Sequence, residues 1–214
     1  MTELASHYQS MLGRATIGDQ LRRHAQHTPD KPAIVFYFAD GTREVHTYDS
    51  LNTRANRMAK ALQEFGVRRG DCVAMMARNS PDYVVAWYAS LKLGAMFTGI
   101  NFTFKEREIS YQVNHAEPKV LIVEDIFVER VEGMTVQIPS VTQYIVSNPT
   151  GRGEALQGWA LFSKLVADDV PADEPVSDVT EYDVAMLQYT SGTEAFPKGV
   201  MIPHRNYLIS TAPA

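Results

Sequence analysis

The stretch with the most distinctive chemistry in this chain is residues 184–202, which read VAMLQYTSGTEAFPKGVMI. Its first part, Val184 to Leu187, is a short apolar run that predicts a buried strand, and a second apolar run covers Val200 to Ile202. Between the two runs lie hydroxyl side chains, glycines and a lysine. A loop of this composition between two strands is suited to holding an anion.

The loop offers three kinds of phosphate ligand. Backbone N–H groups of a tight turn that contains glycine can converge on phosphate oxygens. The hydroxyls of Thr190, Ser191 and Thr193 can donate hydrogen bonds, and Lys198 adds a full positive charge. The Walker spacing G-x-x-x-x-G-K-[ST] is absent, because Lys198 precedes Gly199 and neither Ser nor Thr follows. These residues indicate a phosphate loop of another kind, or else a plain surface turn, because the same residue types form turns.

Composition narrows the class of protein. The hydrophobic share of 45% and charged share of 21% are typical of a globular protein, and a net charge of −5 does not suggest a nucleic-acid partner. Cys72 is the single cysteine, which argues against a disulfide framework or a cysteine metal cluster and suits a reducing cytoplasm. No apolar run approaches the ~20 residues of a membrane span. Met1 to Arg14 lacks the apolar centre of a secretory signal.

Apolar periodicity and capping residues predict the order of the elements. The expected helices are Ile17–His27 capped by Thr16, Tyr48–Phe65 capped by Thr47, Pro81–Leu93 capped by Ser80, Lys105–His115, Glu124–Glu132 and Trp159–Val166. The expected strands before the loop are Ala33–Phe38, Arg43–His46, Cys72–Ala77, Met96–Ile100, Val120–Val123, Tyr144–Val146 and Val184–Leu187. Residues 167–181 are expected to be an acidic connector.

Short apolar strands that alternate with longer helices indicate an α/β fold, with mainly parallel sheets flanked by helices. Residues 1–15 lack periodicity and are expected to be a lead-in, with the α/β part over residues 16–214. Ligands of such sheets bind beyond the carboxyl ends of the strands. Because the loop of residues 190–199, from here on the phosphate loop, follows a strand, it is expected at such a position.

The phosphate loop resembles the signature T-S-G-T-T-G-x-P-K-G of the AMP-forming acyl-CoA synthetases and other adenylate-forming enzymes. The positions that match are Thr190, Ser191, Gly192, Thr193, Pro197, Lys198 and Gly199. Glu194 and Ala195 depart from it, standing where the family usually has Thr and Gly. The resemblance extends from about Thr16 to the end, mostly through packing features such as residues 47–51 and 66–71.

The resemblance implies the N-terminal portion of the large adenylate-forming domain, with the rest of that domain and a mobile C-terminal domain lying beyond residue 214. It implies an enzyme that joins a carboxylic acid, with fatty acids favoured, to coenzyme A at the expense of ATP, with Mg²⁺. Lys198 is expected to be catalytic. The residues expected to bind the nucleotide are Thr190, Ser191, Gly192, Thr193, Glu194, Lys198 and Gly199. The fragment alone is expected to be inactive and, through an exposed apolar face, to self-associate or form a homo-oligomer.

Several alternatives stay open. The acceptor could be a carrier protein loaded with an amino or aryl acid, or the chain could be a non-catalytic nucleotide-binding or interaction module. No resident metal site is expected, because the six histidines do not form a zinc-ligand pattern. His204 is expected to open a helix and Cys72 to lie in the core. Glu194 is expected to turn outward or to reach Mg²⁺, since a carboxylate beside a triphosphate is otherwise repulsive.

Overall fold

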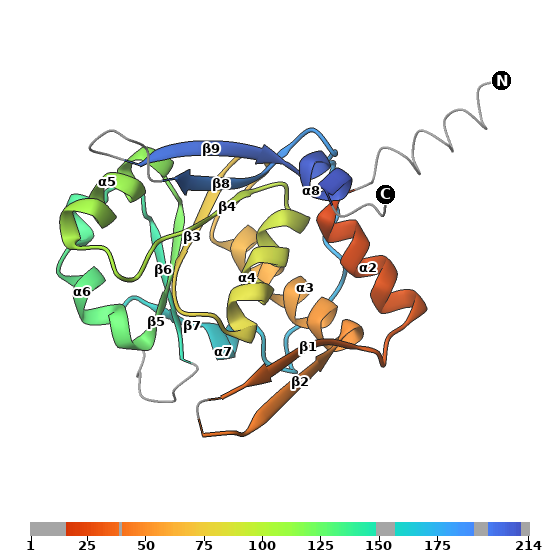
Figure 1. Cartoon of the computed structure of the whole chain (residues 1–214). Coiled ribbons are helices and arrows are strands. Elements are labelled where there is room, and N and C mark those ends of the chain that lie inside the picture. The colour runs from red at the N-terminus through yellow and green to blue at the C-terminus, as the bar shows by residue number, and fades with distance from the viewer. Residues whose placement is uncertain (1–15, 39, 149–156, 191–196, 211–214) are drawn as a thin grey trace.

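A seven-stranded sheet forms the centre of the protein (Figure 1). The computed structural model describes residues 16–38, 40–148, 157–190 and 197–210. The strand order is β7-β6-β5-β3-β4-β8-β9, and every neighbouring pair is parallel except β8 and β9, which are antiparallel. The strands are β3 (Cys72–Met76), β4 (Met96–Gly99), β5 (Val120–Glu124), β6 (Gln143–Ser147), β7 (Ala160–Leu161), β8 (Val184–Thr190) and β9 (Lys198–Pro203). The predicted α/β fold with a mainly parallel sheet is confirmed.

Helices cover both faces of this sheet (Figure 1). The α-helices are α2 (Ile17–His27), α3 (Tyr48–Glu64), α4 (Pro81–Lys92), α5 (Glu106–Ala116), α6 (Val128–Glu132), α7 (Phe162–Leu165) and α8 (His204–Ser210). Two short 3₁₀ turns, η1 (Asp125–Phe127) and η2 (Thr135–Gln137), flank α6. Helices α3, α4 and α7 share one buried cluster with the sheet, and α5 and α6 share the other.

The central strands read as continuous apolar runs because both of their faces are buried. All five residues of β3 are buried. Val73 and Met75 point into the cluster that contains α3 and α4, whereas Ala74 and Met76 point into the cluster of α5 and α6. The same alternation in β5 follows from the two-residue period of a strand.

Capping side chains begin the three N-terminal helices where the sequence predicts. The hydroxyl of Thr16 accepts from the N–H of Asp19 at 3.1 Å, and that of Thr47 accepts from the N–H of Ser50 at 3.2 Å. Ser80 caps α4 in the same way, with Pro81 at the first helical position. These local hydrogen bonds explain why the boundaries of α2, α3 and α4 could be predicted from sequence.

One predicted element is wrong. Residues 159–166 are not one helix: Ala160 and Leu161 form β7, and only Phe162–Leu165 is helical. Ala160 pairs with Ile145 and Leu161 with Val146. The open edge of β6 therefore captures this segment as a parallel strand, and the long-range pairing overrides the local pattern.

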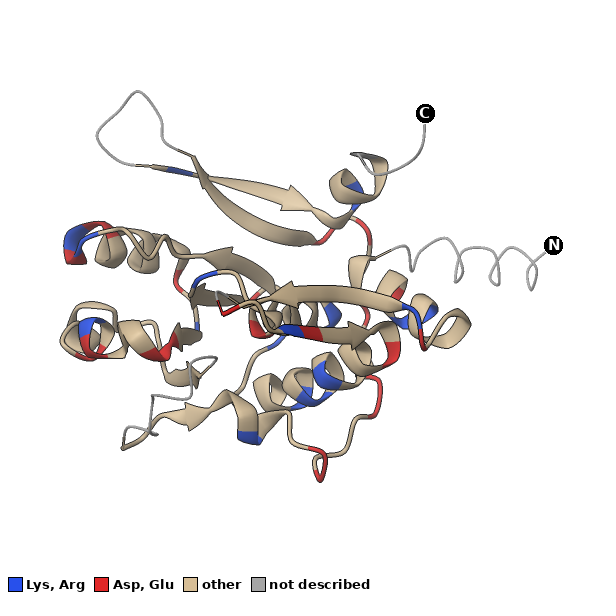
Figure 2. Ribbon diagram, turned by 60° about the horizontal axis from the view of Figure 1, so that its bottom comes forward, with Lys and Arg blue, Asp and Glu red and all other residues tan. Residues whose placement is uncertain are grey.

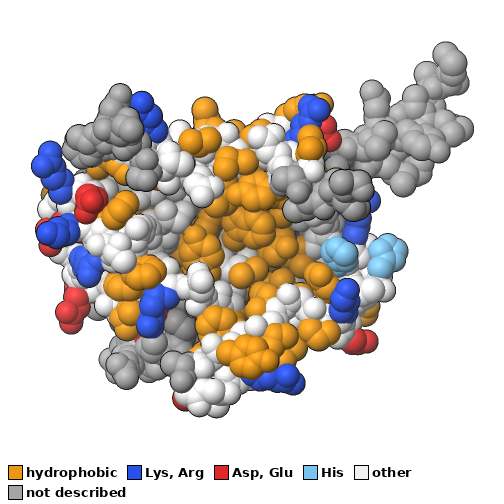
Figure 3. Space-filling view, in the orientation of Figure 1, with side chains coloured by type: hydrophobic (Ala, Val, Ile, Leu, Met, Phe, Trp, Pro, Cys, Tyr) orange, Lys and Arg blue, Asp and Glu red, His pale blue; other side chains and the backbone are white. Residues whose placement is uncertain are grey.

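Two features lie outside the main sheet's interior. Strands β1 (Pro32–Tyr37) and β2 (Arg43–Thr47) form a separate antiparallel hairpin, as predicted. At the other end of the molecule, edge strand β9 carries Met201, which is 66% exposed. Figure 3 shows further hydrophobic side chains gathered across the middle of one face. Among the described helices, none has the length and apolar character needed to cross a membrane.

Candidate phosphate-binding site

Hairpin β8–β9 brings the two ends of the phosphate loop together. Thr190, the last residue of β8, pairs with Lys198, the first residue of β9, and Tyr189 pairs with Gly199. Both Thr190 and Lys198 are exposed. Side chains of directly paired residues in antiparallel strands lie close together, so one hydroxyl and one ammonium share the base of the loop.

The base of the loop lies at the edge of the sheet where parallel strands end. Strand β8 runs parallel to β4, with Phe97 opposite Met186, so the chain after Thr190 leaves the sheet at its carboxyl edge. This is where α/β sheets bind ligands. Ser191, Gly192, Thr193 and Glu194, which are predicted to bind the nucleotide, lie outside the described residues, and their roles stay predictions.

The charge of Lys198 stands out on this hairpin. It is the one charged side chain in the described parts of β8 and β9, and Figure 2 shows this hairpin mostly tan while the helices carry mixed charges. The arrangement can therefore attract an anion to the base of the loop.

Helix α5 holds both arms of the hairpin. The hydroxyl of Tyr111 donates to the carbonyl oxygen of Pro197 at 3.3 Å. The hydroxyl of Tyr189 lies 2.7 Å from Nδ1 of His115 and 3.4 Å from the carbonyl oxygen of Gln112. Burial raises the pKa of Tyr189, so its hydroxyl stays protonated and available as a hydrogen-bond donor at neutral pH. These contacts were not foreseen, although Tyr111 and His115 are four residues apart on one helix face.

His204 opens α8, as predicted, and its side chain is fully buried. Its Nδ1 accepts a hydrogen bond of 3.3 Å from the N–H of Ile17, the first residue of α2. Burial lowers the pKa of His204 to about 4. The histidine is therefore neutral at pH 7, and it joins the first and last described helices instead of contributing charge to the phosphate loop.

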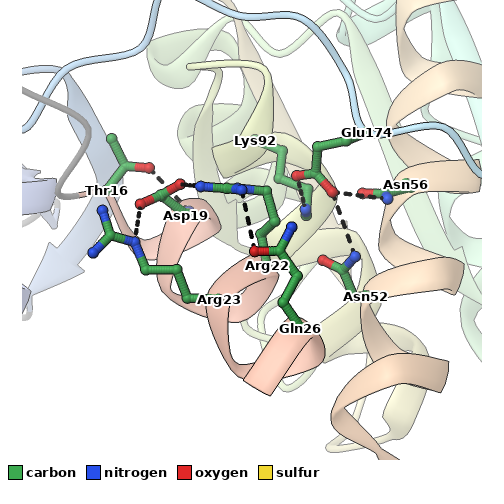
Figure 4. A network of polar contacts seen from close by, with 9 residues as sticks. All are labelled: Thr16, Asp19, Arg22, Arg23, Gln26, Asn52, Asn56, Lys92 and Glu174. Carbon is green, nitrogen blue, oxygen red and sulfur yellow. Dashed lines mark hydrogen bonds and ion pairs between the residues drawn. The ribbon is translucent and has the colours of Figure 1, made fainter. Parts of the chain in front are cut away.

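Away from the phosphate loop, a cleft of about 630 Å³ lies between α2, α3 and the connector of residues 167–181. Figure 4 shows its polar network. The ammonium group of Lys92, at the end of α4, pairs with the carboxylate of Glu174. The amide Nδ2 of Asn56 donates to the same carboxylate at 2.9 Å, and Asp19 pairs with Arg22 and Arg23.

Two of the carboxylates that line this cleft, Asp19 and Glu174, form ion pairs. Burial lowers the pKa of Lys92, and the Glu174 carboxylate opposes that shift. Glu174 therefore anchors the connector of residues 167–181 to the buried end of α4. A lysine placed between Leu91 and Leu93 was the available signal, since a buried lysine requires a partner.

Metal and thiol chemistry find little support in the described part of the chain. Over the described ranges, no three His, Cys, Asp or Glu residues come together as a metal site. Cys72 is buried in β3, as expected, and burial raises the pKa of its thiol to about 12. A thiol of this kind is a poor nucleophile at neutral pH.

Comparison with known proteins identifies the family of this chain. The chain matches the AMP-binding enzyme family over residues 21–214, and it belongs to that family. It is 32% identical over 174 residues to the 4-coumarate–CoA ligase 3 of Oryza sativa subsp. japonica, covering 80% of this chain and 29% of the relative. It is 29% identical over 225 residues to the long-chain-fatty-acid–CoA ligase of Bacillus subtilis, covering 94% and 38%.

A solved structure supports the same assignment. The crystal structure of an anthranilate CoA ligase in complex with anthranoyl-AMP superposes with a TM-score of 0.80 at 26% identity, covering 93% of this chain and 36% of that protein. The chain thus spans about a third of the length of these relatives.

Proposed function

We propose that this chain is the N-terminal portion of an AMP-forming acid–thiol ligase, with residues 1–15 as a lead-in and residues 16–214 as part of the large adenylate-forming domain. Its substrates would be a carboxylic acid, ATP and coenzyme A, with a fatty acid as the favoured acid and the cytoplasm as the compartment. The observation that carries this proposal is the pairing of Thr190 with Lys198 at the carboxyl edge of the sheet.

The proposed reaction has two steps. A carboxylate oxygen attacks the α-phosphorus of ATP, the bond to the β-phosphate oxygen breaks, and pyrophosphate leaves with the electron pair. The coenzyme A thiolate then attacks the acyl carbon, and AMP leaves as the thioester forms.

The phosphate loop would act in the first step. Lys198 and the hydroxyls of Thr190, Ser191 and Thr193 would hold the β- and γ-phosphates and stabilise the charge that develops on pyrophosphate. The amides of Gly192 and Gly199 would complete the cradle, with Glu194 turned outward or toward the cation. Mg²⁺, held mainly by the phosphate oxygens, would supply further positive charge. The residue types at the base of the loop fit this task, because both side chains are exposed and can donate to an anion.

An aryl acid is the second candidate for the substrate. The names of the rice and anthranilate relatives contain aryl acids, whereas the name of the Bacillus relative contains a fatty acid. The described residues do not include a pocket that distinguishes a flat ring from an alkyl chain. The acid must therefore be tested directly.

The test is ATP–pyrophosphate exchange by the protein at its natural length, with saturated fatty acids, coumarate, anthranilate and amino acids offered in turn. We expect acid-dependent exchange with fatty acids, followed by thioester formation when coenzyme A is added. Exchange with no transfer to coenzyme A would point to a carrier-protein acceptor. Binding of ATP without exchange would favour a non-catalytic module and overturn the proposal. The 214-residue chain alone is expected to give no turnover.

A further inference from the structure

Helix α5 lies beside the end of the hairpin where the phosphate loop begins and ends (Figure 1). Tyr111 reaches Pro197, the residue immediately before Lys198, through a hydrogen bond of 3.3 Å. His115 and the Gln112 carbonyl reach Tyr189, the residue immediately before Thr190. One helix therefore contacts both arms of the loop, each one residue away from a predicted phosphate ligand.

The helix itself is firmly held. Ile109 and Val113 are fully buried against the sheet. The side-chain amide of Gln112 donates to the carbonyl oxygen of Gly99, at the end of β4, at 2.9 Å. Because α5 is fixed to the carboxyl edge of the sheet, its contacts with hairpin β8–β9 restrict the movement of that hairpin.

Gly199 permits this close approach. A β-carbon at this position would lie 3.3 Å from Cε1 of His115, 3.4 Å from Cζ of Tyr189 and 3.1 Å from Cδ1 of Leu187. Both rings therefore pack against the backbone of the residue after Lys198. A side chain here would push the rings outward or lift β9 away from α5.

The hydroxyl of Tyr189 carries one hydrogen, and two acceptors, Nδ1 of His115 and the Gln112 carbonyl oxygen, lie within its reach. If His115 is neutral with its proton on Nε2, Tyr189 donates to Nδ1. If His115 is protonated, its Nδ1–H donates to the Tyr189 oxygen, and the hydroxyl turns toward the Gln112 carbonyl.

We propose that Tyr111 and His115 are positioning residues that fix the two arms of the phosphate loop to α5 and so hold Lys198 where it meets the phosphates. This role rests on the proposed function, and it assigns neither residue a contact with the substrate. Without these contacts, hairpin β8–β9 would keep its ladder, but its loop end would move relative to α5.

The first test measures adenylation and thioester formation separately in the protein at its natural length. Tyr111→Phe and His115→Ala should each lower kcat/KM for ATP in ATP–pyrophosphate exchange about three- to tenfold, as expected for one lost hydrogen bond. Thioester formation from supplied acyl-adenylate should change by less than about twofold. The matched controls are Tyr37→Phe, an exposed tyrosine of β1, and His27→Ala, an exposed histidine in the last turn of α2.

A double-mutant cycle separates positioning from a general structural role. In a Lys198→Ala background, Tyr111→Phe should lower kcat/KM for ATP in ATP–pyrophosphate exchange by no more than about twofold, because the group that Tyr111 positions is gone. Full additivity of the two changes, or equal losses in both half-reactions, would overturn the proposal.

Amide hydrogen exchange gives a readout that does not depend on activity. Tyr111→Phe should speed exchange in a peptide covering residues 198–203 about threefold or more, while peptides from β3 keep their rates. An unchanged rate of amide hydrogen exchange at residues 198–203 would overturn the proposal. If the wild type lacks ATP–pyrophosphate exchange, the proposed function fails, and with it the role toward phosphate. Hydrogen exchange would still decide whether α5 holds the loop.

Discussion

Strands β3 and β8 both run parallel to β4, one on each side of it, yet they differ in burial. Every residue of β3 is buried between two layers of helices. In β8 only Ala185 and Leu187 are buried, and the strand ends in the exposed Thr190. The side of the sheet that contains β3 is therefore expected to contribute most to stability, while the side that contains β8 holds the candidate site and the edge strand β9.

The largest expected effect tests the stability side of this contrast. Phe97, on β4, is fully buried and packs edge-on against Tyr83, with ring centroids 5.3 Å apart. Phe97→Ala should lower the free energy of unfolding by about 3–5 kcal/mol, through lost burial and the cavity left behind. Met201→Ala on β9 should change it by less than about 0.5 kcal/mol. Urea unfolding measures both, and comparable losses would mean that the hairpin belongs to the stabilising core.

The next effect concerns the chemistry of the hairpin. Lys198→Ala in the natural-length protein should slow adenylation roughly ten- to a thousandfold, as when one preorganised charge-stabilising group is removed. Stability should stay nearly constant, because Lys198 is exposed. ATP–pyrophosphate exchange and single-turnover transfer from acyl-adenylate measure the two steps. Equal slowing of both would instead assign Lys198 to the fold or to a domain motion.

A smaller effect concerns the pH dependence of the free energy of unfolding. Because burial holds the pKa of His204 at about 4, the unfolded chain binds a proton near pH 6.5 that the folded chain does not. Stability should therefore fall between pH 7 and pH 5, by about 2 kcal/mol from this group. His204→Asn keeps an acceptor for the Ile17 N–H and should flatten that slope. Part of the slope should remain, because burial also lowers the pKa of His46. An unchanged slope in the variant would show that His204 is already protonated in the folded state at pH 5.

The open edge itself predicts weak self-association of the 214-residue chain. Met201 is 66% exposed and Val200 45% exposed on β9, which is an edge strand of the sheet formed by the described residues and offers an apolar surface. Met201→Lys should weaken association several-fold, and Val136→Lys, on the exposed turn η2, is the control. Sedimentation velocity over a concentration series measures this. A wild-type chain that stays monomeric throughout would contradict the prediction.

The smallest expected effect concerns Glu194 and Ala195, where the family signature fails. Changing Glu194→Thr together with Ala195→Gly in the natural-length protein should preserve adenylation at saturating Mg²⁺. ATP should bind somewhat more tightly when Mg²⁺ is scarce, because a carboxylate near the phosphates is removed. Loss of adenylation at saturating Mg²⁺ would give Glu194 a required role.

Local signals made much of the fold predictable. Helices α2, α3 and α4 begin at capping residues and present apolar faces, so both their presence and their starts follow from sequence. The buried strands β3 and β5 are continuous apolar runs, which identify a sheet covered on both faces.

Features that depend on distant partners were not predictable in the same way. Nothing near Ala160 indicates that it pairs with Ile145, so β7 was mistaken for a helix. Glu174 meets Lys92 across 82 positions, and Tyr111 meets Pro197 across 86. Sequence identified Thr190 and Lys198 as two of the candidate phosphate ligands, but only the register of β8 and β9 places them opposite each other.

The strand order has a consequence for the newly made chain. Strand β4 is completed at Gly99, but its neighbour β8 begins only at Val184, after β5, β6 and β7 have been made on the other side of β3. At translation rates of 5–20 residues per second, the hydrogen-bonding edge of β4 would wait roughly 4–17 s for its partner on the ribosome. During that interval the exposed edge can pair with other nascent chains, so slow elongation between Gly99 and Val184 should favour aggregation over correct folding.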